Sequence, residues 1–173
     1  MRKRKDYAIG RLPSEALPHN LAIELKSMHQ RLPVYEVDGD GTAQKQALAT
    51  AELYRLGALL YLYSVCPCLA DDLERAHQLH TVTDILRQMP VCTSPWPLFL
   101  VACEVTTDAH RLLILDTLDR MDRLRNIGNV LVVRRLIEKY WKHLDLRGVA
   151  HTVHARPPFW SFLTIDTAVP WFV

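Results

Sequence analysis

The sequence is poor in glycine, with 6 residues among 173, and it shows no convincing strand-like alternation outside residues 158–165. Regularly spaced turns and alternating apolar residues are the usual signals of β-structure. Leu, Ala, Arg and Glu, which favour helices, are instead frequent. The length suits one domain with a sizeable core. The composition therefore predicts an all-α protein.

Cysteine is also scarce. Its four positions, Cys66, Cys68, Cys92 and Cys103, are too few and too irregularly spaced for a disulfide framework. All four lie in apolar surroundings, as buried free thiols do in a reducing compartment. The uncharged apolar run at residues 56–70 is too short to cross a bilayer, and the basic start is not followed by the apolar segment of a signal peptide. We therefore expect a soluble intracellular protein that does not enter a membrane.

Neither sign of charge dominates, because the formal net charge is only +2. That excess is too small to indicate a nucleic-acid surface, and positive charge is concentrated in residues 2–5, RKRK. We expect residues 1–19, interrupted by Gly10, Pro13 and Pro18, to form a basic, disordered arm. Such an arm could steer the protein to nucleic acid, be read by nuclear import, or only keep the chain in solution.

Helical periodicity covers most of the remaining chain. A short helix is expected at residues 20–31, followed by a turn-rich linker, VDGDGT, whose Thr42 would cap the next helix. Further helices are expected at 43–65, 71–89 and 95–105, from Asp108 to a break at 126–129, and at 130–144. Pairs four residues apart, Asp116 with Arg120 and Asp119 with Arg123, would support the fifth of these helices. The fold class predicted is an irregular all-α bundle of five or six helices.

The segment SPWPLFLVACEV, residues 94–105, has an unusual start for a helix. Ser94 suits the N-cap, and Pro95 suits the first helical position, where its missing N–H is harmless. Glu104 interrupts an apolar run, and a buried carboxylate without a partner is costly. We expect Glu104 to pair with an arginine such as Arg111, or to cap a neighbouring element; a carboxylate of a ligand pocket is the alternative.

Metal and catalytic motifs are weak. Cys66 and Cys68 precede His77 and His80, but zinc sites usually draw on a second pair of cysteines, and none is present. Cys103 with His110 or His151 would be the nearest approach to a nucleophile and its base, yet a thiol in an apolar helix is poorly reactive. GxSxG, Walker, HExxH and dinucleotide motifs are absent. We expect no enzyme, no cofactor and no metal ion in this chain.

Three stretches occur in a characteristic order and spacing: AELYRLGALLYLYSV at 51–65, WPLFLVACEVTTDAHRLLILDTLDRM at 96–121, and GNVLVVRRLIEKYWKHLDL at 128–146. Together with the closing VPWFV at 169–173, they resemble the fungal-specific transcription factor domain that lies C-terminal to binuclear zinc-cluster DNA-binding modules. The resemblance implies a helical regulatory domain over residues 20–173, the C-terminal part of that family's domain. The motif positions that it assigns to the core are Tyr54, Leu60, Trp96, Pro97, Leu98, Phe99, Cys103, Glu104, Asp108, Arg111, Asp116, Trp141 and Asp145.

The resemblance also implies a nuclear protein that controls an activation function through self-association, a transcriptional co-regulator or a small-molecule effector. The family's six-cysteine cluster is missing here, because the first cysteine is Cys66. We therefore expect this chain to bind no zinc and read no DNA, unless a cysteine cluster lies upstream. The chain would then be either a piece of a longer factor or a free-standing regulatory domain. The alternative function is an independent helical dimerisation module; a Cys/His enzyme is less favoured.

Overall fold

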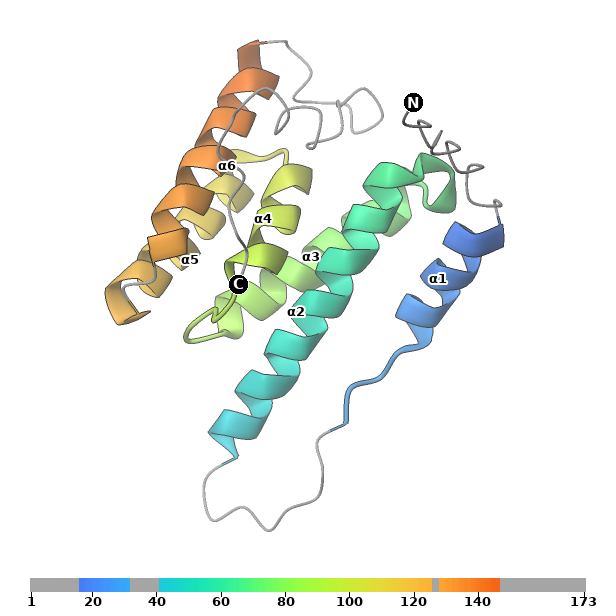
Figure 1. The fold of residues 1–173 in the computed structure, drawn as a ribbon, viewed down its shortest axis with the longest axis horizontal. Helices are drawn as coiled ribbons and strands as arrows, with labels where there is room; N and C mark the ends of the chain where they lie inside the picture. Colours follow the sequence, from blue (N-terminus) through green and yellow to red (C-terminus); the bar gives the residue numbers. More distant parts are fainter. Residues whose placement is uncertain (1–15, 32–40, 126–127, 147–173) are drawn as a thin grey trace, which may run out of the picture.

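The computed structural model describes residues 16–31, 41–125 and 128–146. In these ranges the chain forms six α-helices and one 3-10 turn, and no strand (Figure 1). They are α1 (Ala16–Ser27), α2 (Thr42–Val65), η1 (Pro67–Leu69), α3 (Asp72–Gln88), α4 (Pro95–Glu104), α5 (Asp108–Arg125) and α6 (Gly128–Leu146). The predicted all-α bundle is confirmed. Residues 1–15 of the predicted arm, the possible strand at 158–165 and the VPWFV segment lie outside the described residues.

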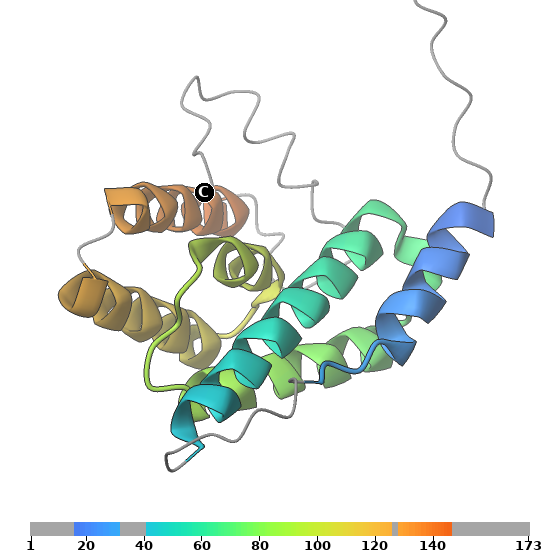
Figure 2. The same ribbon diagram turned by 60° about the horizontal axis from the view of Figure 1, so that its bottom comes forward.

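Helix α4 is the buried centre of the bundle. It contacts α2, α3, α5 and α6, and Figures 1 and 2 show it surrounded by these longer helices. Every side chain from Pro97 to Cys103 is buried. A helix that is apolar on all sides belongs in the interior, so this segment must be covered by the others. Helix α1, in contrast, lies on the outer side of α2 in both views.

Helices α2 and α4 approach each other closely at Gly57. A Cβ added to Gly57 would lie 3.2 Å from the Cβ and 3.3 Å from the Cα of Pro97. The missing side chain therefore lets the first turn of α4 lie directly against α2. Pro95 and Pro97 are tolerated in this turn because its N–H groups have no acceptor within the helix.

Helices α5 and α6 bury the faces that their periodicity predicts. Ile114, Leu118 and Met121 of α5 are all fully buried. Val133, Ile137 and Leu144 of α6 are at most 1% exposed. The same core cluster includes Leu53, Leu56 and Leu60 of α2, so one apolar core unites the helices around α4.

The first two helices start at other residues than predicted. Helix α1 begins at Ala16 rather than Asn20, because Pro18 falls in the first turn, where it costs no hydrogen bond. It ends at Ser27 instead of Arg31, and the Ser27 hydroxyl donates to the Glu24 carbonyl at 3.0 Å. Helix α2 is preceded by Gly41, whose φ of 69° suits glycine. Gly41, not Thr42, therefore occupies the N-cap position.

Some later boundaries also differ from the prediction. Helix α6 begins at Gly128, inside the predicted break, and continues to Leu146. The turn η1 was not predicted; it follows Cys66 and begins with Pro67, which has no N–H to continue α2. Helix α3 begins after Asp71, whose carboxylate accepts from the Glu74 N–H at 2.8 Å. An acidic N-cap of this kind agrees with the sequence pattern.

Replacing Gly57 by leucine should destabilise the protein, because the new side chain would separate α4 from α2. Overpacking of this kind costs about 1–3 kcal/mol, which corresponds to roughly 2–4 °C in Tm per kcal/mol for a domain of this size. Chemical denaturation of the purified chain measures the change. Ala47→Leu is the matched control, since Ala47 is exposed on α2. Equal stability of the two variants would contradict the close packing at Gly57.

Candidate functional site

The sequence motifs meet at the two ends of α4. At its start, the rings of Tyr54 and Trp96 stack with centroids 5.8 Å apart and planes inclined by 16°. The Tyr54 hydroxyl donates a hydrogen bond to the Ser94 hydroxyl. Ser94 occupies the N-cap position of α4, as predicted. Its hydroxyl accepts the hydrogen bond from Tyr54 of α2 and makes no capping hydrogen bond to α4. Tyr54 remains 42% exposed, so this junction is open to solvent on one side.

At the other end of α4, α6 supplies a buried hydrogen bond. The indole N–H of Trp141 donates to the carbonyl of Ala102 at 2.7 Å, and Trp141 is only 5% exposed. Arg111 of α5 lies over the same indole, with its guanidinium carbon 5.4 Å from the ring centroid. Its two terminal nitrogens bind both carboxylate oxygens of Asp145 at 2.9 and 2.7 Å. These contacts join α4, α5 and α6.

Glu104 pairs with a different arginine from the one suggested by the sequence. Its carboxylate lies 3.9 Å from Nη1 of Arg75, and the two side chains are 11% and 6% exposed. Arg75 also donates to the carbonyl of Tyr63 and lies over the Tyr63 ring. The expected arginine partner is therefore present, but it is Arg75; Arg111, the example that the sequence suggested, is directed to Asp145. A cavity of about 110 Å³ borders Arg75 and Glu104.

Sequence reasoning missed Arg75, although a signal was present. Arg75 is spaced at four, seven and eleven residues from Leu79, Val82 and Leu86, a spacing that places all four on one helical face. Val82 and Leu86 are fully buried. A lone arginine on an apolar stripe is a candidate for an interior partner of Glu104, because a buried charge needs a counter-ion.

The remaining motif positions divide between core and surface. Leu60, Pro97, Leu98, Phe99 and Cys103 are buried. Asp108, at the start of α5, is 94% exposed in its side chain, and Asp145 and Asp116 are also exposed. Asp116 pairs with Arg120 at 3.1 Å, as the four-residue spacing predicts. The Asp119 carboxylate, however, pairs with Arg134 of α6, and Arg123 donates to the Asp119 backbone carbonyl at 3.2 Å instead.

Arg120 has a second role that the sequence did not indicate. Its guanidinium donates to the carbonyl of Met89 at 2.9 Å, and it reaches the carbonyls of Pro90 at 3.4 Å and Leu86 at 3.5 Å. The last carbonyls of a helix have no partner within it and carry partial negative charge. Arg120 therefore stabilises the end of α3 from α5.

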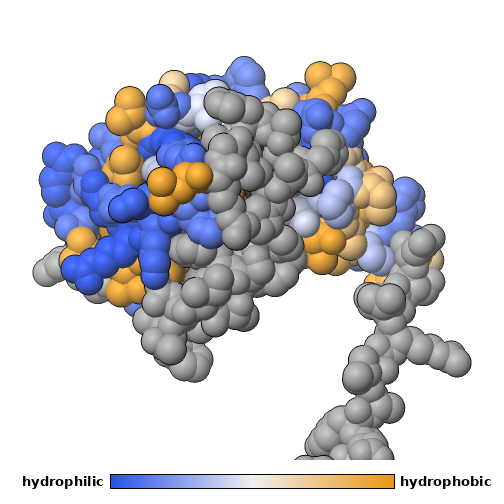
Figure 3. Space-filling view, turned by 90° about the horizontal axis from the view of Figure 1, so that it is seen from above, coloured by the Kyte–Doolittle hydropathy of each residue, from blue (hydrophilic) through white to orange (hydrophobic). Residues whose placement is uncertain are grey.

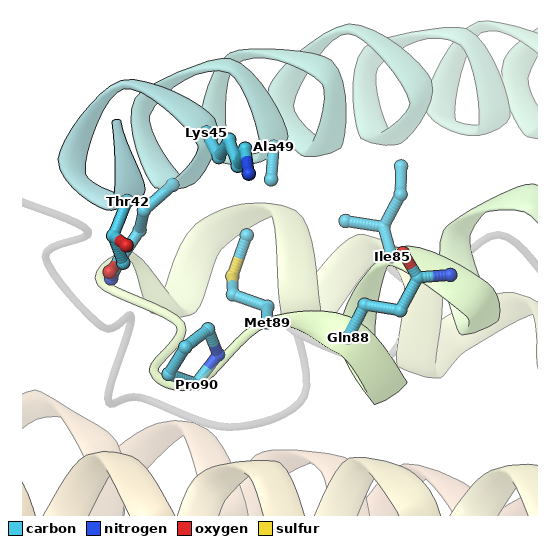
Figure 4. Close-up of a pocket in the computed structure, with 8 residues that line it drawn as sticks. Thr42, Lys45, Ala49, Ile85, Gln88, Met89 and Pro90 are labelled. Carbon is cyan, nitrogen blue, oxygen red and sulfur yellow. The ribbon is translucent and has the colours of Figure 1, made fainter. Parts of the chain in front are cut away.

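A pocket of about 280 Å³ lies between the start of α2 and this end of α3. Figure 4 shows Lys45 and Ala49 projecting from α2 toward Met89, with Ile85 and Gln88 on α3. Thr42, Gln46 and Pro90 complete the lining. Met89 is only 3% exposed and belongs to the main core, so the pocket extends from a polar rim to the apolar interior.

The candidate metal ligands do not form a site. In residues 16–31, 41–125 and 128–146, no three His, Cys, Asp or Glu side chains come together in a way that could hold a metal ion. All four cysteines are free thiols: Cys68 is exposed, Cys66 is partly buried, and Cys92 and Cys103 are buried. His80 is directed to Asp84, 2.9 Å away. Nor does any described helix have the length and apolar character needed to cross a bilayer.

The two buried thiols, Cys92 and Cys103, lie in apolar surroundings. Burial raises the pKa of the Cys92 thiol, and the Ser94 carbonyl accepts from it at 3.3 Å. Cys103 is 5% exposed within the apolar cluster. The pKa of His110 is lowered by burial, and further by the positive charge of Arg87. His151, the other predicted base, lies outside the described residues. A thiol kept in its neutral form is a poor nucleophile.

Replacing Trp141 by phenylalanine should lower the free energy of unfolding by about 1–3 kcal/mol, because the Ala102 carbonyl would lose its donor inside the core. Trp96→Phe is the matched control and should cost less than about 1 kcal/mol, since Trp96 is half-buried and a phenyl ring can still stack on Tyr54. Urea denaturation of both variants tests this. A larger loss for Trp96→Phe would contradict the role given to the Trp141 hydrogen bond.

Alkylation with iodoacetamide should separate the cysteines by burial. Cys68 should react first and Cys66 next, whereas Cys92 and Cys103 should react about 100-fold more slowly, because their thiols become accessible only when the bundle opens. Peptide mass mapping over time measures the four rates, and the chain unfolded in guanidinium provides the reference. Rapid alkylation of Cys103 in the folded chain would restore the nucleophile hypothesis.

Comparison with known proteins agrees with the motif assignment. Residues 5–167 match the family described as the fungal specific transcription factor domain. Transcription factor iacI of Pestalotiopsis fici is 24% identical over 123 residues, which cover 70% of this chain and 31% of that protein. No solved structure matches the chain. Because the family match extends over nearly the whole sequence, the chain belongs to the fungal-specific transcription factor domain family.

Proposed function

We propose that this chain is a regulatory domain of a nuclear transcription factor and that it controls transcription through the packing of its helices. DNA is read elsewhere, by another segment or another protein. The observation that carries this proposal is the position of the motif residues. They form contacts between helices at both ends of α4, through Tyr54 and Ser94 at one end and Trp141 and Ala102 at the other.

Such an arrangement suits a domain that changes its packing. A ligand shifts a conformational equilibrium only if it binds one state better than the other. The contacts at the two ends of α4 join α2, α4, α5 and α6, so a partner that alters either junction changes how several helices meet. The family and the relative named as a transcription factor support transcription as the process controlled.

The surface has sites that suit a protein partner and a site that suits a small molecule. Leu17, Leu21 and Ile23 of α1 are 62%, 44% and 54% exposed. On the face seen in Figure 3, apolar side chains form separate patches between hydrophilic ones. Patches of this kind suit a co-regulator or a second copy of the chain, while the pocket beside α3 suits a small effector. Both kinds of partner would act through the same helical contacts.

Fusing the chain to a heterologous DNA-binding module should change expression of a reporter in fungal cells by several-fold. Leu60→Asp should abolish the change, because a carboxylate in the core costs more than about 4 kcal/mol, much of a domain's stability. Leu112→Asp is the matched control and should retain the change, since Leu112 is 66% exposed. Reporter activity is measured at equal protein levels.

An unchanged reporter with the folded fusion would contradict a regulatory role. A response that survives Leu60→Asp would show that an unfolded segment carries the activity and that helical packing does not. The chain without the DNA-binding module is the reference for effects unrelated to promoter binding.

A further inference from the structure

We propose that the pocket between the start of α2 and the end of α3 binds a small carboxylic acid with a compact apolar body. The site deepens the proposed function by naming an effector class, and its regulatory meaning rests on that function. The proposal stands on three features of the pocket: its shape, the polar groups at its rim and the segment that forms its wall.

The shape suits a small amphipathic molecule. The volume is about 280 Å³, near the lower end of the range for ligand pockets. Ala49, Ile85 and Met89 form an apolar interior that is continuous with the main core. A phenyl ring or a short branched chain would displace water from this surface, which is the main source of affinity in apolar pockets.

The rim favours an acid over a neutral or basic molecule. Lys45 is exposed and lines the pocket, and among the described residues no carboxylate forms an ion pair with it. Gln88, also exposed, offers an amide donor on the opposite wall (Figure 4). Hydrogen bonds to an ionised partner are the stronger ones. A carboxylate at the rim would therefore meet an ammonium group and an amide while its apolar end reaches Met89.

The wall of the pocket is also the connection to α4. Met89 and Pro90 begin the segment that leads to Ser94. This segment is held to α2 at two points: Gln46 donates to the Val91 carbonyl at 3.1 Å, and Tyr54 donates to Ser94. A ligand between Lys45 and Met89 would thus press on the only stretch of chain that joins α3 to α4. Binding at this site has a direct structural route to the start of α4.

Two probes of nearly equal shape test the site in the purified full chain: 3-phenylpropanoate and its neutral isostere, 3-phenylpropanamide. Saturation-transfer NMR should show the acid binding with a Kd on the order of 1 mM. Lys45→Gln should weaken binding of the acid about fivefold and leave the amide unchanged, the range for an exposed ion pair. Lys142→Gln is the matched control, since Lys142 is exposed on α6, and should leave both probes unchanged.

Ala49→Trp should abolish binding of both probes by filling the interior. If that variant fails to fold, nuclear Overhauser effects from the phenyl protons to the Met89 methyl in the unmutated chain locate the ligand instead. Failure of both probes to bind, or contacts that exclude Met89, would overturn the site. Equal binding of acid and amide, unaffected by Lys45→Gln, would overturn the ligand class.

These results are separable from the proposed function. If the tethered chain changes the reporter but neither probe binds, the pocket is not an effector site and the regulatory domain stands. If the acid binds through Lys45 but the tethered chain never changes the reporter, the site stands and the proposed function fails.

Discussion

Helix α4 presents apolar side chains on every face, so it is stable only where other helices cover it completely. Ten residues are too few to form a helix in water without such support. The rest of the fold meets this requirement in different ways. Gly57 has no side chain, so α2 can approach the proline-containing first turn of α4. The apolar faces of α5 and α6 cover other sides of α4. Helices α2, α3, α5 and α6 all contact this short segment.

Carbonyl groups at the ends of several helices accept hydrogen bonds from side chains of other helices. In α1 to α4, a carbonyl at or near the last turn accepts from a distant side chain: Leu25 from Arg55, Tyr63 from Arg75, Met89 from Arg120, and Ala102 from Trp141. Three of these donors are arginines, whose charge also offsets the negative end of the helix dipole. Carbonyl groups that would otherwise be unpaired inside the bundle therefore serve as contacts between its helices. A shift of one helix end would therefore disturb its hydrogen bond to the helix that supplies the donor.

The sequence was sufficient for features that depend on neighbours within one helix. The stripe of Ile114, Leu118 and Met121 and the pair of Asp116 with Arg120 follow from spacing alone. It was insufficient wherever the partner comes from another helix. Asp119 pairs with Arg134 across to α6, and Glu104 takes Arg75 from α3, because tertiary packing decides which cation is nearer. The pocket was also beyond the sequence, since Lys45 and Met89 meet only after α2 and α3 pack.

The two ends of α4 differ in their capacity to move. At the C-terminal end of α4, the hydrogen bond from Trp141 to the Ala102 carbonyl is buried, and the ion pair of Arg111 with Asp145 supports it. Opening it would expose a large indole and leave a carbonyl unpaired, both of which are costly. At the start of α4, Tyr54 is 42% exposed; its hydroxyl donates to Ser94 and its ring stacks on Trp96. Segments with fewer buried contacts open at lower free energy. The contact of Tyr54 with Ser94 and Trp96 is therefore the weaker of the two junctions, although the first turn of α4 stays packed against α2 at Gly57.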